Sequence, residues 1–248
     1  MINTFNETKL HNTLKKIYAF EKNGKTEQKI RNYIADVTTE SNEIIEIQTS
    51  NVSILKEKLN FYLSENKKVT IVYPVIEEKT IETQNETSAE ILSKRKSQKQ
   101  ETIYSLIRQL TGLSTFIPHK NLTIEALFVS VTEIRKKTDE KLQNRTNTRR
   151  FKKNYLITEK KLNEIRRKTL FNTLDDYKKL LPQNTPNPFT PPELKKIILN
   201  QEEYKSLTKR SRKNLEKNIA VTIWFLEKIK ILKKTQKKGR SFLYTIEY

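Results

Sequence analysis

The order of helical and strand-like segments in the first 84 residues constrains the fold of this chain more than any other feature. Apolar residues recur there at helical or alternating spacing, in segments separated by polar breaks. The segments are helix, strand, strand, helix, strand and strand, at residues 6–20, 29–37, 43–48, 53–64, 69–75 and 79–83. Adjacent strands pair most simply as a hairpin, and a helix between strands carries the chain back over the sheet. The sequence therefore predicts an α/β domain with a mixed sheet.

The second strand, within NEIIEIQTSN at residues 42–51, carries polar side chains on one face. Because side chains alternate along a strand, Glu46 and Gln48 point to one side and Ile45 and Ile47 to the other. An edge strand with one solvated face would have this pattern. The alternative is a strand that presents a carboxylate and an amide to a chemical site.

Two further carboxylates are placed to join Glu46. Asp36 ends the preceding strand, so a hairpin would bring it close to Glu46 at one end of the sheet. Glu7 lies in the first turn of the first predicted helix. Carboxylate oxygens bind Mg²⁺, and this metal polarises a phosphoryl oxygen and lowers the pKa of a bound water. We therefore expect a magnesium site formed by Asp36, Glu46 and Glu7, with chemistry suited to phosphodiester hydrolysis.

The positive charge of the chain is concentrated in its C-terminal part. The chain has 248 residues and a formal net charge of +20. Residues 141–248 hold 28 Lys and Arg against 10 Asp and Glu, whereas residues 1–140 are nearly neutral. Such an excess indicates a polyanionic partner, and nucleic acid is favoured over an anionic membrane because no amphipathic helix with a bulky apolar face accompanies the charge. A surface that only keeps the protein soluble is the alternative.

The last 80 residues predict three helices and a terminal hairpin. These segments are expected at residues 173–181, from Thr190, at 208–229 and from about 230 to 248. The middle helix has the clearest start, because Thr190 and Glu193 have the spacing of a capping box. Three helices followed by a hairpin are the arrangement of a winged-helix domain.

In a winged helix, the third helix enters the major groove of DNA and the hairpin contacts the backbone nearby. Basic residues gather at both places, the start of the third helix and the tip of the hairpin. We therefore expect duplex DNA to be the partner, contacted by Lys209, Arg210, Arg212, Lys213, Lys217, Lys237, Lys238 and Arg240. The alternative is binding to another protein, because some winged-helix domains act as protein interaction modules.

The N-terminal segments and their acidic residues resemble the PD-(D/E)XK nuclease superfamily, whose core is helix, three strands, helix and strand. The resemblance covers residues 6–83 and is carried by Asp36, Glu46 and, more weakly, Glu7. It implies a restriction-endonuclease-like sheet and Mg²⁺-dependent cleavage of DNA. The segments HNTLKKIYA, IIEIQTSNVSILKEKL and VYPV and the C-terminal hairpin also resemble uncharacterised bacterial proteins that pair such a core with a winged helix.

Gln48 stands where that superfamily usually has a catalytic Lys. Some restriction enzymes of the superfamily resemble this sequence in having Gln at that place. In other members the Lys comes from the following helix, where Lys58 or Lys56 would serve. The resemblance therefore implies catalytic roles for Asp36, Glu46, Gln48 and Lys58. A degenerate core that only binds DNA is the alternative.

The segment order and the composition also predict the domain organisation and the compartment of the protein. We expect a PD-(D/E)XK-like domain at residues 1–140, a basic connector at 141–167 and a winged-helix domain at 168–248. Cys is absent, which excludes disulfides and thiolate chemistry. No apolar stretch reaches the ~18 residues of a membrane span and no secretory signal is present, so we expect a cytoplasmic protein without a membrane partner.

The expected function is that of a DNA-binding protein that acts as a Mg²⁺-dependent endonuclease. The alternative is a non-catalytic winged-helix protein, such as a transcription regulator, with a degenerate nuclease core. Paired cutting of both DNA strands would favour a homodimer. His11 and His119 lack the spacing of a zinc site, and we expect His11 to pack in the helix or to lie on the surface.

Overall fold

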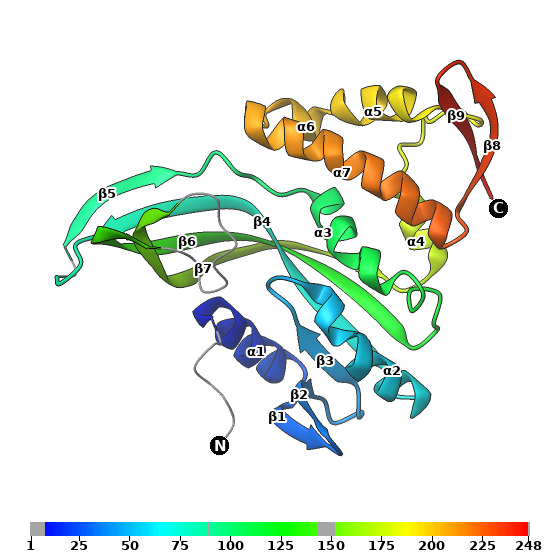
Figure 1. Ribbon diagram of the computed structural model, residues 1–248. Coiled ribbons are helices and arrows are strands. Elements are labelled where there is room, and N and C mark those ends of the chain that lie inside the picture. The colour runs from blue at the N-terminus through cyan, green and yellow to red at the C-terminus, as the bar shows by residue number, and fades with distance from the viewer. Residues whose placement is uncertain (1–7, 89, 143–151, 248) are drawn as a thin grey trace.

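The structure, a computed structural model, describes residues 8–88, 90–142 and 152–247, and its N-terminal part is an α/β unit (Figure 1). In chain order this part comprises α1 (Lys9–Glu21), β1 (Lys25–Ile30), β2 (Tyr33–Thr38), β3 (Ile44–Ile47), η2 (Val52–Leu55), α2 (Lys56–Ser64), β4 (Val69–Gln84), β5 (Ile91–Lys96), α3 (Ile103–Leu110), η3 (Thr111–Leu113), β6 (Leu122–Leu142) and β7 (Lys153–Phe171). The C-terminal part comprises α4 (Leu174–Lys178), α5 (Pro191–Leu199), α6 (Glu202–Lys205), α7 (Lys209–Lys228), β8 (Leu232–Lys238) and β9 (Ser241–Ile246).

One mixed sheet organises the N-terminal part. Its strand order is β1-β2-β3-β4-β6-β7, and β5 pairs with the last residues of β4. Strand β4 runs parallel to both β3 and β6, and the other pairs are antiparallel. Helices α2 and α3 lie in the crossovers between the parallel strands. The predicted α/β fold with a mixed sheet is therefore confirmed.

The strands on either side of residue 40 pair as predicted, because Val37 of β2 lies opposite Ile45 of β3 in an antiparallel ladder. The segment expected as one strand at residues 29–37 is instead split between β1 and β2, which form a tight hairpin. Arg31 in this turn has φ 52°, the left-handed conformation that two-residue hairpin turns require. Three strands therefore separate α1 from α2.

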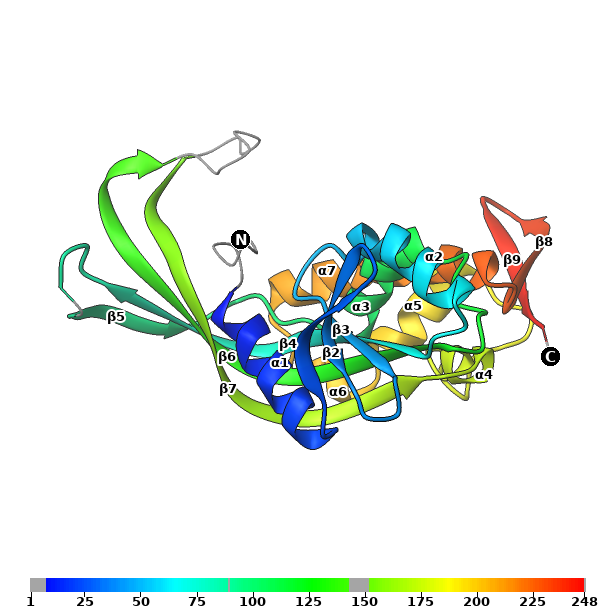
Figure 2. The same ribbon diagram turned by 90° about the horizontal axis from the view of Figure 1, so that it is seen from below.

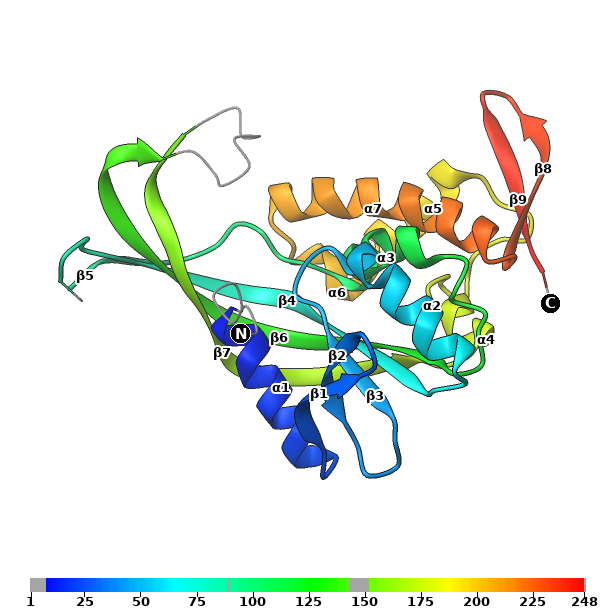
Figure 3. The same cartoon turned by 60° about the horizontal axis from the view of Figure 1, so that its bottom comes forward.

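Helices cover both faces of the sheet (Figure 3). On one face, Leu10 and Leu14 of α1 form a buried cluster with Ile45 and Ile47 of β3. On the other face, Ile44 belongs to a second and larger cluster, which includes side chains of α2, α3 and the C-terminal helices. All four residues of β3 are consequently buried.

Strands β4 to β7 continue beyond the helices as a curved extension, which we call the arm (Figure 2). It consists of β5, the end of β4 and the outer parts of β6 and β7. Two sequence predictions are wrong here. The polar composition of residues 84–100 favours a loop, but this segment contains β5, and the connector expected at 141–167 contains β7 from Lys153 onward. Register shifts interrupt the β6–β7 ladder at several points, and such bulges increase the twist of a strand pair.

The C-terminal elements begin close to their predicted positions. Thr190 caps α5 in a capping box, because its amide donates to the Glu193 carboxylate at 2.7 Å and its hydroxyl accepts from the Glu193 amide. Thr208 caps α7. Gly239 lies between β8 and β9 with φ 62°. Within the described ranges, no helix combines the length and the apolar character needed to cross a membrane.

The N-terminus of α7 is tied to the segment between β5 and α3. The hydroxyls of Thr208 and Ser211 both donate to the carbonyl of Gln98, at 2.6 and 3.0 Å. The amide of Gln100 in turn donates to the Ser211 hydroxyl at 2.8 Å. Helix α7 is therefore fastened to the N-terminal part at its first turn.

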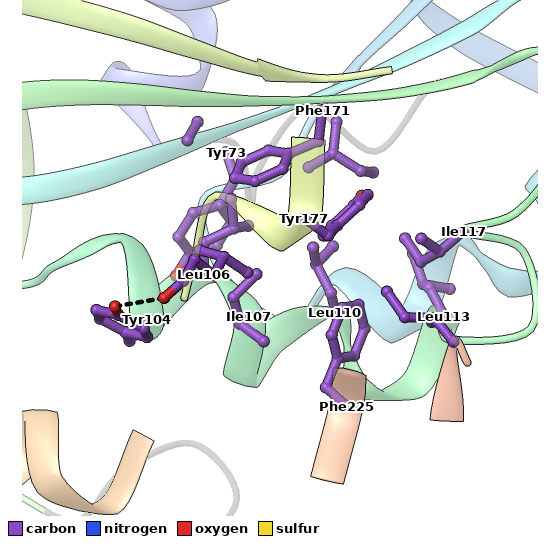
Figure 4. Close-up of a cluster of buried hydrophobic side chains, with 14 of the residues drawn as sticks. Tyr73, Tyr104, Leu106, Ile107, Leu110, Leu113, Ile117, Phe171, Tyr177 and Phe225 are labelled. Carbon is purple, nitrogen blue, oxygen red and sulfur yellow. Dashed lines mark hydrogen bonds between the residues drawn. The ribbon is translucent and has the colours of Figure 1, made fainter. Parts of the chain in front are cut away.

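Aromatic side chains join the two parts of the chain further along α7 (Figure 4). The ring of Phe225 lies 5.9 Å from that of Tyr177 in α4, which stacks at 4.7 Å on Phe171 at the end of β7. All three belong to the same buried cluster as Leu106 and Leu110 of α3. One core therefore crosses the boundary predicted near residue 168.

Candidate functional site

Strand β3 presents a carboxylate to helix α2, in keeping with its alternating sequence. Ile45 and Ile47 pack toward α1. Oε2 of Glu46 accepts a hydrogen bond from Nζ of Lys58 at 2.7 Å, and the Glu46 side chain is only 1% exposed. The interpretation of this segment as a solvated edge strand is wrong, because β3 has a paired strand on each side.

Asp36 lies beside Glu46 on the neighbouring strand. The Val37–Ile45 pair, continued by one residue, places Asp36 opposite Glu46. Oδ2 of Asp36 accepts a hydrogen bond from the Ile47 amide at 2.8 Å and lies 3.3 Å from Nε2 of His11 in α1. The structure thus brings together the two carboxylates that the sequence predicts to converge. We call the group formed by Asp36, Glu46, Lys58 and His11 the β3 site.

The lysine of the β3 site comes from helix α2 and not from the strand. Lys58 has a side chain that is 20% exposed and points to Glu46, whereas Lys56 is exposed at the start of α2. Gln48 follows β3 directly and is half-buried. Its backbone N–H donates to the Val72 carbonyl at 2.9 Å. Of the two lysines that the sequence allows, the structure places only Lys58 in contact with the carboxylates.

Burial controls the protonation of the β3 site. Loss of water around Glu46 raises its pKa to about 7, because this effect outweighs the attraction of the Lys58 ammonium. Burial also opposes the ionisation of Asp36, but its contacts with His11 and with the Ile47 amide, together with the charge of Lys58, hold its pKa below the usual value. At neutral pH, Asp36 is ionised and Glu46 is close to the midpoint of its titration.

Among the residues that the structure describes, two buried polar atoms at this place have no hydrogen-bond partner. They are Oε1 of Glu46 and the hydroxyl of Tyr62 on α2. Burial and, after it, the charges of Glu46 and Asp36 raise the pKa of the Tyr62 hydroxyl. An interaction of the Tyr62 hydroxyl with Glu46 also contributes to this shift, so the hydroxyl and the carboxylate oxygen lie next to each other and can satisfy each other.

The carboxylates of the β3 site fit a magnesium ion. Mg²⁺ is commonly held by one or two carboxylates, with water completing its coordination. Asp36 and Glu46 provide such a pair on neighbouring strands. Within residues 8–88, 90–142 and 152–247, no group of three or more His, Cys, Asp or Glu side chains is placed to hold a metal ion. The third expected ligand, Glu7, lies outside the described residues.

His11 and Tyr62 belong to this region although the sequence gives neither a role in the site. His11 differs from the expectation of simple packing or surface exposure, because it contacts Asp36. The spacing of four residues between Glu7 and His11 is the sequence signal for its place at the site, since residues four apart share one face of the helix predicted at residues 6–20. A helix that directs Glu7 to the carboxylates would therefore also direct His11 there.

The basic residues predicted to contact DNA form two groups. On α7, the exposed members are Lys209, Arg210, Lys213 and Lys217. Arg212 is an exception, because it is half-buried and its guanidinium donates to the Leu199 carbonyl at 3.3 Å. Arg212 therefore ties α7 to α5.

The second basic group lies on the β8–β9 hairpin, where Lys237, Lys238 and Arg240 are exposed. Helix α7 begins beside α6, whereas the hairpin lies beyond its other end (Figure 1). The α7 group occupies the first nine residues of the helix, and the remaining 11 residues, roughly 16 Å at 1.5 Å per residue, lie between it and the end of α7. Trp224 lies between them in the chain and is 41% exposed. The basic surface is extended and not compact.

The fold and the β3 site define an α/β protein whose mixed sheet carries paired carboxylates. Residues 8–172 match the family described as "Domain of unknown function (DUF8091)", and the chain belongs to this family. The matched range contains every strand of the large sheet and ends just after β7.

An uncharacterized protein of Treponema pallidum (strain Nichols) is similar to this chain, with 30% identity over 161 residues. The match covers 65% of this chain and 61% of that relative. The chain therefore matches less than two thirds of the relative's length. No solved structure matches the chain.

Proposed function

We propose that this protein is a Mg²⁺-dependent endonuclease that binds duplex DNA and hydrolyses its phosphodiester bonds. The observation that carries the proposal is the 2.7 Å contact between Lys58 and Glu46, with Asp36 opposite Glu46 on the next strand. An aspartate, a second carboxylate and a lysine are the residues implied by the resemblance to PD-(D/E)XK nucleases. The order α1, β1, β2, β3, α2 and β4 also agrees with the core of that superfamily and supports the proposal.

Each residue of the β3 site has a role in this proposal. Asp36 and Glu46 would hold the metal, which supplies a polarised phosphoryl oxygen and an activated water when bound. Lys58, which donates to Oε2 of Glu46, would place its ammonium group beside the carboxylates, where it could stabilise the negative charge that develops on the attacked phosphate. His11 and the Ile47 amide hold the Asp36 carboxylate in place through Oδ2.

The exposed basic residues of α7 and of the hairpin would bind the DNA backbone, as a winged helix does. The two groups lie toward different ends of α7, so they could contact different phosphates of one duplex. Such contacts supply affinity without reading the sequence.

Cleavage of duplex DNA tests the proposal directly. The protein should nick or cut a supercoiled plasmid with Mg²⁺ or Mn²⁺ and should be inactive in chelator. Asp36→Ala should lower the cleavage rate at least about 100-fold, because the metal loses a ligand. Its DNA affinity, measured in chelator, should not change, because the basic groups are untouched. Retention of full activity by Asp36→Ala would contradict the proposal.

Lys58→Ala and Lys56→Ala form a matched pair on one helix. Lys58→Ala should slow cleavage by about 100-fold or more, because Lys58 is the ammonium group at the carboxylates. Lys56→Ala should change the rate by no more than roughly twofold, since the charge of an exposed lysine is screened by salt. Equal losses in the two variants would exclude a specific role for Lys58.

A DNA-binding protein without nuclease activity, such as a transcription regulator, is the second candidate. It is favoured by the contacts of both carboxylates with a basic side chain, Asp36 with His11 and Glu46 with Lys58. A core of this kind needs no metal to balance the ionised carboxylates. Calorimetric titration with Mn²⁺ separates the candidates. Equal heats for the wild type and the Asp36→Ala/Glu46→Ala double variant would exclude a metal site.

A further inference from the structure

A pocket of about 250 Å³ lies at the end of β3, next in the chain to the β3 site. Residues 49–51, which follow Gln48, form part of its wall. Three lysines from different segments also line it: Lys79 on β4, Lys99 before α3 and Lys160 on β7. The pocket therefore brings together three ammonium groups, two of which are paired with Glu133 and Glu101.

The carboxylates near these lysines already have partners on both oxygens. Glu133 accepts from Lys79 at 2.8 Å with one oxygen and from Arg135 with the other. Glu101 accepts from Lys99 at 2.7 Å with one oxygen and from a backbone amide with the other. Each of the two carboxylates is thus held by other groups through both of its oxygens.

Lys160 is the lysine of the pocket that makes no direct ion pair with these carboxylates, although the charges of Glu133 and Glu101 act on it. It lies opposite Glu133 in the β6–β7 ladder, but Lys79 and Arg135 occupy that carboxylate. Lys160 is half-buried, and the described residues provide no hydrogen bond or ion pair for its ammonium group. Burial lowers the pKa of Lys160, as it does for any ammonium group withdrawn from water. Its ammonium group lines the pocket outside the ion pairs of Lys79 and Lys99, so it is the cation there that is free to meet a bound anion.

We infer that this pocket binds a phosphodiester group of the nucleic-acid strand held at the β3 site. The inference rests on the proposed function, because it places the strand along β3 and past Gln48. Lysine ammonium groups are common phosphate ligands, and the Ser50 side chain adds a hydroxyl donor at the rim. Pockets for complete small molecules hold roughly 300–1,000 Å³. A volume of about 250 Å³ suits a phosphate and part of a sugar, with the rest of the strand outside. Lys160 is then a positioning residue for the strand.

Lys160→Gln and Lys161→Gln form a matched pair for the test. Neighbours on a strand point to opposite faces, and Lys161 is exposed and lies 3.7 Å from Glu159. Affinity for duplex DNA is measured by fluorescence anisotropy in chelator, from about 50 to about 300 mM salt. Lys160→Gln should reduce the slope of log affinity against log salt by about 0.9, and the affinity at about 0.1 M salt by roughly eightfold. Lys161→Gln should change both the salt slope and the affinity much less. Equal slopes for the two variants would overturn the inference.

A second pair of variants keeps the test valid if Lys160→Gln folds poorly. Ser50 is exposed at the pocket, so Ser50→Asp adds a negative charge with little effect on the core. Ser50→Asp should weaken DNA binding at least as much as Lys160→Gln, and clearly more than Ser50→Asn, which has nearly the same size but no charge. Equal affinities of the two Ser50 variants would contradict the inference.

Pyrophosphate distinguishes a nucleic-acid strand from a free phosphate compound. Calorimetry should show only weak binding of pyrophosphate, because this small anion lacks the neighbouring nucleotides that contact the rest of the proposed DNA surface. Tight pyrophosphate binding that Lys160→Gln abolishes, with unchanged DNA affinity, would assign the pocket to a small phosphate compound. All these measurements are made in chelator without cleavage, so a negative result here and a negative cleavage assay are separate outcomes.

Discussion

The burial of Glu46 gives the stability of this protein a pH dependence opposite to that of most carboxylates. Its pKa is about 7 in the folded state, compared with 4.5 for an ordinary Glu. Between these pH values, the folded state holds a proton that the unfolded chain releases. The favourable contribution is fully present below about pH 4.5 and is lost as the pH rises through about 7. The free energy of unfolding should fall across this interval by on the order of 1–3 kcal/mol.

Denaturant unfolding in chelator, at about pH 5 and about pH 8, measures this effect. Glu46→Gln carries no titrating carboxyl group, so the difference between the two pH values should shrink by the same amount. If the wild type and Glu46→Gln show the same pH dependence, Glu46 does not hold a proton in the folded state.

For single residues, the sequence predicts which face of β3 is polar, but it does not predict every member of the β3 site. Strict alternation fixes Glu46 on the side opposite Ile45, and the hairpin sets Asp36 beside it. The choice between Lys56 and Lys58 depends on the phase of α2. The sequence does not reveal that phase, because the 3-10 turn η2 precedes the helix and winds at a different angle.

Gly112 is the position where two short elements approach most closely. A Cβ atom at Gly112 would lie 2.1 Å from Oγ and 2.9 Å from Cβ of Ser53. Gly112→Ala should therefore force η3 away from η2 and lower the free energy of unfolding by about 1–3 kcal/mol. In a Ser53→Gly background both obstructing atoms are gone, so the same substitution should cost much less.

A double-mutant cycle by chemical denaturation measures this coupling. A coupling free energy of about 1 kcal/mol or more is expected. Additive effects of the two substitutions would show that η2 and η3 move apart without strain.

Elements with a local signal are predicted well, and elements made by distant pairing are not. The capping box of Thr190 and Glu193, a motif of four consecutive residues, marks the start of α5. Strand β5 carries no comparable signal, because all six of its residues are exposed and four of them are polar or charged. Its strand conformation depends on pairing with β4, which lies at least seven residues earlier in the chain.

The whole molecule should unfold as one unit because one core includes both parts. Trp224, the only tryptophan, reports on α7, whereas far-UV circular dichroism reports on all helices and strands. The two signals should change at the same denaturant concentration. Phe225→Ala should shift both transitions together and cost about 3–5 kcal/mol, because Phe225 is fully buried between α7 and α4.

Lys217→Ala, on the exposed side of α7, serves as the control and should cost less than about 0.5 kcal/mol. A tryptophan transition that precedes the circular dichroism transition would show that the C-terminal helices unfold separately. The sequence predicts apolar faces on α3 and α7, but it does not reveal that these faces pack against each other. Amphipathic spacing identifies a buried face without identifying its partner.

The arm has a consequence for how this family can diverge. Its strands pair mainly with one another, well beyond the helices that cover the β3 site (Figure 2). Each residue pair gained or lost in the β6–β7 hairpin would change the reach of the arm by about 3.4 Å and would leave β3 untouched. Insertions of two residues per strand preserve which side chains face each side, whereas single insertions reverse them. Relatives should therefore vary in length chiefly at the arm, in even steps along each strand, while the spacing from Asp36 to Lys58 stays constant.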